Sequence, residues 1–166
     1  MGMSTLPNSL NPSLLVYAAK IKDDSLRRVV VEHLDSVNPE FSEAPSSTKF
    51  HHTYSGGLMN HTIEVCLIGE RIIFSLGLDV NLDHFYAAAL LHDAGKTRWS
   101  TPEHERGVVR DLEEAGRKIP PEVEEAILGH MGGWSKTGVY PDKLLGTVLH
   151  AADLISSRWE RDGRRV

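Results

Sequence analysis

An adjacent histidine and aspartate, His92 and Asp93, stand where an apolar segment gives way to a glycine. Residues 85–91 read Phe-Tyr-Ala-Ala-Ala-Leu-Leu, and Gly95 and Lys96 follow the doublet closely. Because Gly95 can adopt positive φ, we expect a helix to end here with both polar side chains at its terminus. Burying an imidazole beside a carboxylate is costly without a partner, and a metal cation is the most economical partner. The doublet therefore predicts a metal site.

Four further residues of metal-ligand type lie on both sides of the doublet. They are His61, His104, His130 and Asp153. Several helices that each deliver an imidazole or a carboxylate to a common point bind a divalent cation well. We expect one metal to be held by His61, His92, Asp93 and Asp153, and a second to be held by His104 and His130 with Asp93 as a bridge. Two metals can stabilise both the attacking and the leaving oxygen of an in-line displacement.

The spacing of apolar residues predicts an all-α fold, a single compact helical bundle with the metal site between its central helices. We expect helices over residues 14–21, 23–37, 57–76, 82–92, 101–116, 121–132 and 143–159. The Ala-rich segment 82–92 is expected to be central. Thr101 is expected to cap a helix that has Pro102 in its first turn. We expect residues 40–55 to form an irregular connection and His33 to be a solvated helix position.

Length and composition fit one globular domain, with 166 residues of which 40% are hydrophobic and 25% charged. We expect residues 1–20 to form an N-terminal segment with a short helix, residues 21–160 to form the domain, and residues 161–166 to be a basic, frayed tail. The net charge of −5 argues against a protein that coats nucleic acid, but it allows a nucleotide or an RNA end to be held locally.

Cysteine usage and hydropathy indicate the compartment. Cys66 is the only cysteine, which precludes an intrachain disulfide, and we expect it in the core. No apolar run approaches the ~20 residues of a membrane span, and the N-terminus has no signal-peptide pattern. We therefore expect a cytoplasmic protein that does not enter a membrane.

Two sequence blocks resemble those of a known family. They are Gly56-Gly57-Leu58-Met59-Asn60-His61 and His92-Asp93-Ala94-Gly95-Lys96. Both are similar to blocks of the HD superfamily of metal-dependent phosphohydrolases. The double histidine His51-His52 resembles that of the HD domains of bacterial 3′-to-5′ exoribonucleases, and the blocks around His104, His130 and Asp153 resemble those of endoribonuclease Y. The resemblance covers roughly residues 20 to 160.

The resemblance implies an HD domain and assigns the metal ligands residue by residue. It implies His61, His92, Asp93 and Asp153 as primary ligands, and His104 and His130 as ligands of a second metal. Met131 stands where the related ribonucleases often carry a second consecutive histidine. The second site is therefore expected to be weak or empty in comparison with theirs.

The resemblance also implies residues that meet the substrate. Asp93 and Lys96 are the implied catalytic residues, and Lys96 is the implied phosphate contact, with a solvated loop lysine as the alternative. His52 is implied to line the mouth of the substrate pocket, or else to pack the loop. Arg158 and Arg98 are further candidates for phosphate, with a solvated surface position as the alternative for each.

Three functions remain open from the sequence. The first is a metal-dependent phosphohydrolase that cleaves a phosphoester of a nucleotide or small phosphorylated compound with a metal-activated water. The second is a phosphodiesterase or nuclease acting on RNA ends or cyclic nucleotides, in which Trp99 and Trp134 either stack bases or simply pack. The third is a non-catalytic metal- or ligand-sensing module. The expected cofactor is one or two divalent ions among Mn, Fe, Co, Ni, Zn and Mg. The oligomeric state stays open.

Overall fold

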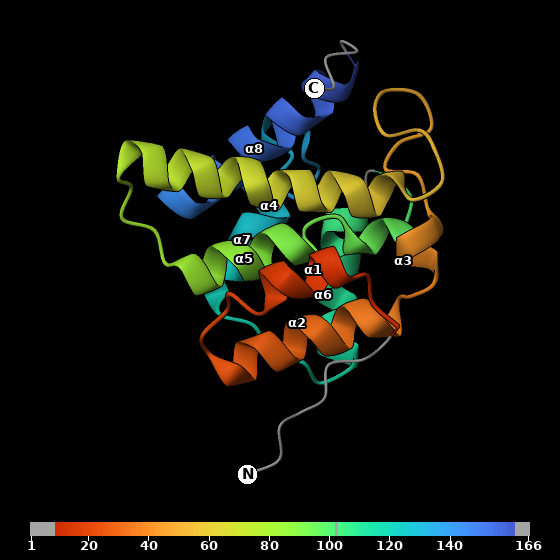
Figure 1. Ribbon diagram of the computed structural model, residues 1–166, viewed down its shortest axis with the longest axis horizontal. Coiled ribbons are helices and arrows are strands. Elements are labelled where there is room, and N and C mark those ends of the chain that lie inside the picture. The colour runs from red at the N-terminus through yellow and green to blue at the C-terminus, as the bar shows by residue number, and fades with distance from the viewer. Residues whose placement is uncertain (1–8, 102, 162–166) are drawn as a thin grey trace.

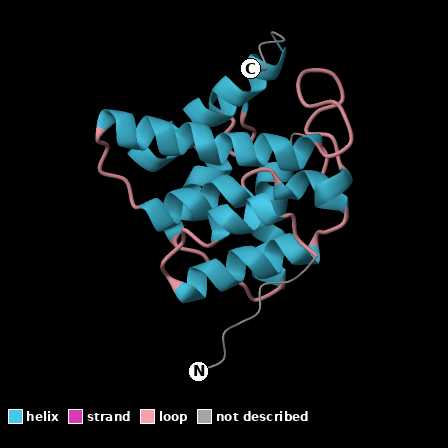
Figure 2. Cartoon of the chain, viewed as in Figure 1, coloured by secondary structure: helices cyan, strands magenta, loops and turns pink. Residues whose placement is uncertain are grey.

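The computed structural model describes residues 9–101 and 103–161, in which all regular structure is helical (Figure 2). The helices are α1 (Pro12–Ala18), α2 (Asp24–Ser36), α3 (Glu40–Glu43), α4 (Gly57–Leu76), α5 (Leu82–Leu91), α6 (His104–Glu114), α7 (Pro121–Gly129) and α8 (Leu144–Arg161). Two 3₁₀ turns, η1 (Ala94–Thr97) and η2 (Gly132–Trp134), follow α5 and α7. The predicted all-α bundle is therefore confirmed. The predicted roles of Pro102 and of residues 162–166 in the basic tail lie outside the described residues.

Helix α5 lies at the centre of the bundle. Every residue from Phe85 to Leu91 is buried, and α5 packs against α1, α2, α4, α7 and α8. Figure 1 shows α4 on one side of α5 and α2 on the other, while α4 pairs extensively with α8. A helix that is apolar on all sides is stable only when neighbours cover every face, which explains the central place of the Ala-rich segment.

Local signals set the ends of the two helices that deliver the first ligands. Gly56 and Gly77 flank α4 with left-handed φ angles of 82° and 60°, a conformation that favours glycine. The side chain of Asn81 accepts a hydrogen bond from the backbone N–H of His84 at 3.2 Å and so begins α5.

Several helices differ in extent from those predicted, and one was not predicted. Helix α1, predicted over residues 14–21, spans Pro12–Ala18. Residues 40–43 form α3, because Phe41 is fully buried in the core and draws the segment inward. Helix α6 begins at His104 without a side-chain cap, so Thr101 is not its N-cap; the N–H of Glu103 instead bonds to the carbonyl of Ser100 at 2.6 Å in a turn before the helix. The helix predicted to reach residue 132 ends at Gly129 and is followed by η2.

Gly95 and His33 play other parts than those expected. Gly95 lies in η1 without positive φ. Its role is close packing, because a Cβ at this position would lie only 2.1 Å from the carbonyl oxygen of His104. His33 is only 1% exposed, so the prediction of a solvated position was wrong. Burial, followed by the charge of Arg117, lowers the pKa of His33 to about 4.

The core and the hydropathy of the helices bear on two remaining expectations. Cys66 is fully buried in the core, as expected, and burial raises the pKa of its thiol. In the ranges that the structure describes, no helix is both long enough and apolar enough to cross a membrane.

Candidate metal centre

The six predicted metal-binding side chains converge between the central helices. They come from α4 (His61), the end of α5 (His92 and Asp93), the first residue of α6 (His104), the end of α7 (His130) and α8 (Asp153). Five of them are at most 1% exposed, and the side chain of Asp153 is 14% exposed. Residues that are far apart in the sequence thus form one buried cluster, with Asp93 in its middle.

One half of the cluster, called here the first half, consists of His61, His92 and Asp153 around one oxygen of Asp93. Nε2 of His61 lies 3.0 Å from Oδ1 of Asp153 and 3.5 Å from Oδ2 of Asp93. Nε2 of His92 lies 3.5 Å from the same Asp93 oxygen. Two imidazole nitrogens and two carboxylates therefore face a common point.

The second half consists of His104 and His130 around the other oxygen of Asp93. Oδ1 of Asp93 lies 3.2 Å from Nε2 of His104 and 3.4 Å from Nε2 of His130. These two nitrogens are 3.4 Å apart. Asp93 thus directs one carboxylate oxygen to each half, which is the geometry of a bridging ligand.

Unpaired polar atoms inside the cluster indicate that it fits a cation. Nε2 of His61, Nε2 of His92 and Oδ1 of Asp93 are buried without a hydrogen-bond partner of good geometry among the described residues. Buried polar atoms are rarely left unpaired. The ligand atoms of His61, His92 and Asp93 lie within 4.8 Å of one another, as do those of Asp93, His104 and His130. Imidazole with carboxylate suits divalent transition metals. The cluster therefore implies divalent metal binding.

Outer hydrogen bonds direct the imidazole nitrogens toward the centre. His92 and His130 each follow the last residue of a helix, and each donates Nδ1–H to the carbonyl three residues earlier, Ala89 at 2.8 Å and Ile127 at 2.7 Å. Because a neutral imidazole carries one proton, Nε2 of both rings is left bare toward Asp93. Such bonds fix the tautomer and the ring orientation of a metal-binding histidine.

The electrostatics of the cluster favour ionised carboxylates. Burial raises the pKa of Asp93, but Lys96, His92 and the imidazoles of the second half outweigh burial and hold this pKa well below its usual value. Burial also raises the pKa of Asp153, yet the adjacent imidazole of His61, followed by those of His130 and His92, leaves this pKa lowered. Burial lowers the pKa of His92 to about 4, which keeps that ring neutral. Neutral imidazoles and ionised carboxylates are the forms that bind metals.

Lys96 lies at the edge of the cluster. Its Nζ is 2.6 Å from Oδ2 of Asp93, and its side chain is 15% exposed. The sequence left open whether this lysine is solvated or belongs to the site, and the ion pair places it in the site.

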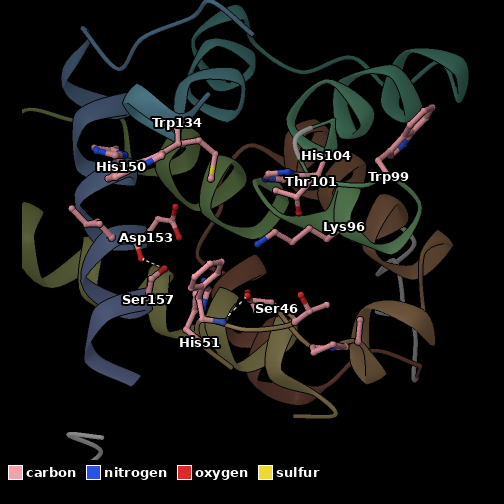
Figure 3. Close-up of a pocket in the computed structure, with 17 residues that line it drawn as sticks. Ser46, His51, Lys96, Trp99, Thr101, His104, Trp134, His150, Asp153 and Ser157 are labelled. Atoms are coloured by element: carbon pink, nitrogen blue, oxygen red, sulfur yellow. Dashed lines mark hydrogen bonds between the residues drawn. The ribbon is translucent and has the colours of Figure 1, made fainter. Parts of the chain in front are cut away.

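A cavity of about 460 Å³ opens beside the cluster (Figure 3). Lys96, His104 and Asp153 belong to its wall, and in Figure 3 Lys96 extends toward its middle. The rim carries Phe50 and Trp134, which are 66% and 62% exposed. The cavity therefore joins a charged floor to an aromatic rim.

The two tryptophans predicted near the site differ. Trp99 lines the cavity but is held in place, because its Nε1 donates to Asp111 at 3.2 Å and the guanidinium of Arg110 lies 4.9 Å from its ring centroid. Packing therefore accounts for Trp99, whereas Trp134 presents most of its surface to solvent at the rim.

The two adjacent histidines, His51 and His52, lie in different environments. His51 belongs to the cavity wall. His52 lies behind it, fully buried, and bonds through Nε2 to Glu64 at 2.9 Å. The predicted pocket residue His52 thus packs the loop, and its neighbour faces the substrate space. Burial, followed by the proximity of His61, lowers the pKa of His51 to about 4.

The two candidate arginines lie apart from the cavity. Arg158 is exposed on α8 and Arg98 is paired with Asp111 at 3.8 Å; neither belongs to the cavity wall. Conversely, the sequence reasoning missed Ser156, which bonds to His61, and Glu64, which bonds to Ser156. The spacing His-x-x-Glu on a single helix is a signal for Glu64, since residues three apart share a face.

Comparisons with known proteins agree with this site. An HD domain family model matches residues 58–158. The chain is 32% identical, over 173 aligned positions, to the dihydroneopterin 2′,3′-cyclic phosphate phosphodiesterase of Methanocaldococcus jannaschii, and the match covers 87% of this chain and 68% of that protein. The chain therefore belongs to the HD domain family. It is a metal-dependent phosphohydrolase, which replaces the hypothesis of a non-catalytic sensor.

Ribonucleases are also among the relatives. The chain is 32% identical over 92 positions to the 3′-5′ exoribonuclease YhaM of Shouchella clausii, covering 55% of this chain and 28% of that protein. Its identity to YhaM of Bacillus subtilis is 26% over 91 positions, covering 55% of this chain and 29% of that protein. The chain thus spans less than a third of these ribonucleases. No solved structure matches the chain significantly.

Proposed function

We propose that the substrate is a small phosphodiester, with the cyclic phosphate of a nucleotide-like compound as the first candidate. The cavity carries this proposal, because its volume of about 460 Å³ suits a mononucleotide-sized ligand. Three members of its wall, Lys96, His104 and Asp153, belong to or border the metal centre. Similarity to a cyclic phosphate phosphodiesterase over 87% of the chain supports the same class of substrate.

The residues of the site have separate tasks in hydrolysis. One or two divalent ions, when bound, supply Lewis acidity and an activated water at neutral pH. The imidazole-rich ligand set favours Mn²⁺, Fe²⁺, Co²⁺, Ni²⁺ or Zn²⁺ over Mg²⁺. Asp93 contributes one carboxylate oxygen to each half of the centre. Lys96 neutralises charge that develops on the phosphoryl oxygens.

The aromatic rim suits the organic part of the substrate. Phe50 and Trp134 leave large ring surfaces in solvent beside the cavity. A planar heterocycle covers such surfaces by stacking, which contributes roughly 1–3 kcal/mol per base in nucleic-acid complexes. A phosphate on the floor and a ring at the rim would then fill the cavity together.

A substrate panel tests the proposed class. We expect the purified chain with Mn²⁺ to hydrolyse 2′,3′-cyclic nucleotides and bis(p-nitrophenyl) phosphate, and to leave p-nitrophenyl phosphate nearly intact. The same panel with Asp93→Ala should be silent. Preference for the monoester would contradict a phosphodiesterase and indicate a nucleotidase.

A pair of tryptophan variants tests the rim. Trp134→Ala should raise KM for a 2′,3′-cyclic nucleotide about tenfold, the loss of one stacked base. The effect on a cyclic diester without an aromatic base, such as glycerol 1,2-cyclic phosphate, should be small. Trp159→Ala is the matched control, because Trp159 is 43% exposed and lies outside the cavity wall. Equal effects of Trp134→Ala on both substrates would overturn the stacking role.

RNA ends are the second candidate, favoured by the similarity to YhaM over 55% of the chain. The net charge of −5 weighs against it. Incubation with 5′-labelled single-stranded RNA distinguishes the two, since a nuclease shortens the RNA from its end and binds it less tightly as salt rises. Intact RNA together with rapid hydrolysis of cyclic nucleotides is the expected result.

A further inference from the structure

Glu64 accepts two hydrogen bonds from different parts of the site. It lies on α4 three residues after His61, on the same face of the helix. Its Oε2 accepts the hydroxyl proton of Ser156 at 2.8 Å and Nε2–H of His52 at 2.9 Å. An ionised carboxylate only accepts hydrogen bonds, so both partners must act as donors. This requirement determines which atom carries the proton at each step of two hydrogen-bond chains that start at Glu64.

The first chain of hydrogen bonds runs from Glu64 to the metal centre. Ser156 has a single hydroxyl proton, which it gives to Glu64, so its oxygen must accept the bond to Nδ1 of His61 at 2.9 Å. His61 therefore carries its proton on Nδ1. Its bare Nε2 is the atom that lies 3.0 Å from Asp153 and 3.5 Å from Asp93.

The second chain ends in the cavity. A neutral His52 that gives Nε2–H to Glu64 has a bare Nδ1, which lies 3.2 Å from Nδ1 of His51. His51 must then donate Nδ1–H to His52, and its own Nε2 is bare. Because His51 lines the cavity, this nitrogen is available to accept a hydrogen bond from a ligand there.

The backbone around His52 is built to hold this chain. His52 has a φ of 46°, a left-handed conformation that is unfavourable for residues other than glycine. Its carbonyl accepts N–H of Ser46 at 3.0 Å. Gly57 packs against the same carbonyl so closely that a Cβ would lie 2.0 Å from its oxygen. Unfavourable backbone conformations persist where the surroundings impose them, often at functional sites.

We propose that Glu64 is a positioning residue that orients two imidazoles at once. Through Ser156 it presents Nε2 of His61 to the metal, and through His52 it presents Nε2 of His51 to a hydrogen-bond donor of the substrate or its attacking water. The second of these roles rests on the phosphodiesterase function proposed above; the first does not.

Three variants separate the two chains. Ser156→Ala breaks the chain to the metal. His52→Asn breaks the chain to the cavity, and asparagine tolerates the left-handed backbone better than most residues other than glycine. Glu64→Gln affects both. Glu70→Gln is the matched control, because Glu70 lies on the same helix and accepts bonds from Lys20 and Tyr86 away from the cavity.

Metal affinity and ring protonation are the first readouts, and neither depends on activity. We expect Ser156→Ala and Glu64→Gln to weaken Mn²⁺ binding about tenfold in calorimetric titrations, with His52→Asn and Glu70→Gln within twofold of the unmodified protein. In two-bond ¹H–¹⁵N spectra of the zinc-loaded protein, His51 should carry its proton on Nδ1. His52→Asn and Glu64→Gln should convert this signal to a mixture of tautomers.

Kinetics complete the test. At saturating Mn²⁺, His52→Asn should lower kcat/KM for the diester at least tenfold. Ser156→Ala should then hydrolyse the diester almost as fast as the unmodified protein. The proposal is overturned if His51 carries its proton on Nε2 in the unmodified protein, or if Glu64→Gln behaves like Glu70→Gln. A protein that shows the expected spectra and metal affinities but hydrolyses no diester would refute the proposed function, and with it the role of His51 toward the substrate, and leave the role of Glu64 in orienting His61 standing.

Discussion

The two halves of the metal centre share Asp93 but are supported differently. In the first half, Nδ1 of His61 bonds to Ser156 and Nδ1 of His92 bonds to the carbonyl of Ala89. Asp153 adds a second carboxylate to that half. Each imidazole is therefore held from outside, and two carboxylates face the point where an ion would bind.

The second half has less support. His130 bonds to the carbonyl of Ile127 at 2.7 Å, but Nδ1 of His104 is buried without a hydrogen-bond partner among the described residues. Asp93 supplies the only carboxylate of this half. Outer partners are worth about 10- to 100-fold in metal affinity. Convergence of ligands thus defines both halves, whereas outer hydrogen bonds and charge are expected to rank their metal affinities.

Loss of the shared ligand should produce the largest effect. Asp93→Ala removes a carboxylate oxygen from both halves, so we expect metal retention to be lost and kcat/KM to fall by about 1,000-fold or more. Elemental analysis of dialysed protein and initial rates measure the two effects. Asp79→Ala, an exposed aspartate away from the site, is the control. Full activity of Asp93→Ala would refute the centre altogether.

Substitution of one ligand from each half should separate the two metals. We expect His104→Ala to keep one tightly bound equivalent of Mn²⁺, and His61→Ala to lose the tight equivalent, because the first half has more charge and outer support. Competition with a chromogenic chelator gives both stoichiometry and affinity. If the two variants retain metal equally, the proposed ranking of the halves is wrong.

An added metal ligand in the second half should reduce the difference in metal affinity between the two halves. Met131 follows His130 directly and lines the cavity. Met131→His should tighten binding of the weaker equivalent about tenfold, as the gain of a nearby imidazole, and leave the tight equivalent unchanged. Met131→Gln is the control for polarity without an imidazole. Tightening of both equivalents would mean that the halves are not independent.

His33 is a buried histidine outside the metal centre, so it serves as the reference for an imidazole that is buried without metal ligands around it. Burial lowers the pKa of His33 to about 4, and its unfolded value is 6.5. The unfolded chain therefore binds more protons between these values, so His33 costs stability as pH falls from about 6.5 to 4. Between pH 7.5 and pH 5, His33 should account for about 2 kcal/mol of the decrease in the free energy of unfolding, and His33→Leu should abolish that part of the decrease.

Urea unfolding of both proteins with EDTA measures this effect without metal. We expect the metal content of His33→Leu, before EDTA treatment, to match that of the unmodified protein. An unchanged pH dependence in the variant would show that His33 is not responsible, and a loss of metal would link it to the centre.

Residue types and helical periods predict a large part of this molecule. The apolar segment around Ala88 predicts a central helix, and the six ligand types at helix positions predict the cluster. Periodicity does not reveal which of two neighbours turns inward at an irregular loop, so the sequence assigned to His52 the place at the cavity that His51 occupies. Their places depend on a left-handed backbone and on Glu64, which are tertiary features.

Some local signals have more than one structural solution. A glycine after the doublet indicates a left-handed helix end, but Gly95 provides close packing instead. A histidine on a charged helix is typically solvated, yet neighbouring helices cover His33 completely. In both cases tertiary packing decides, and a single sequence contains no direct record of it.

The contact of Gly95 with the carbonyl of His104 has a consequence for how the two halves are spaced. With 2.1 Å between a would-be Cβ and that oxygen, backbone meets backbone directly between the turn after Asp93 and the start of α6. Main-chain packing, rather than side chains that can adopt other rotamers, thus fixes where the start of α6, and with it His104, lies relative to Asp93. Substitutions among the ligand side chains would change metal affinity, while this spacing between the two backbone segments would stay the same.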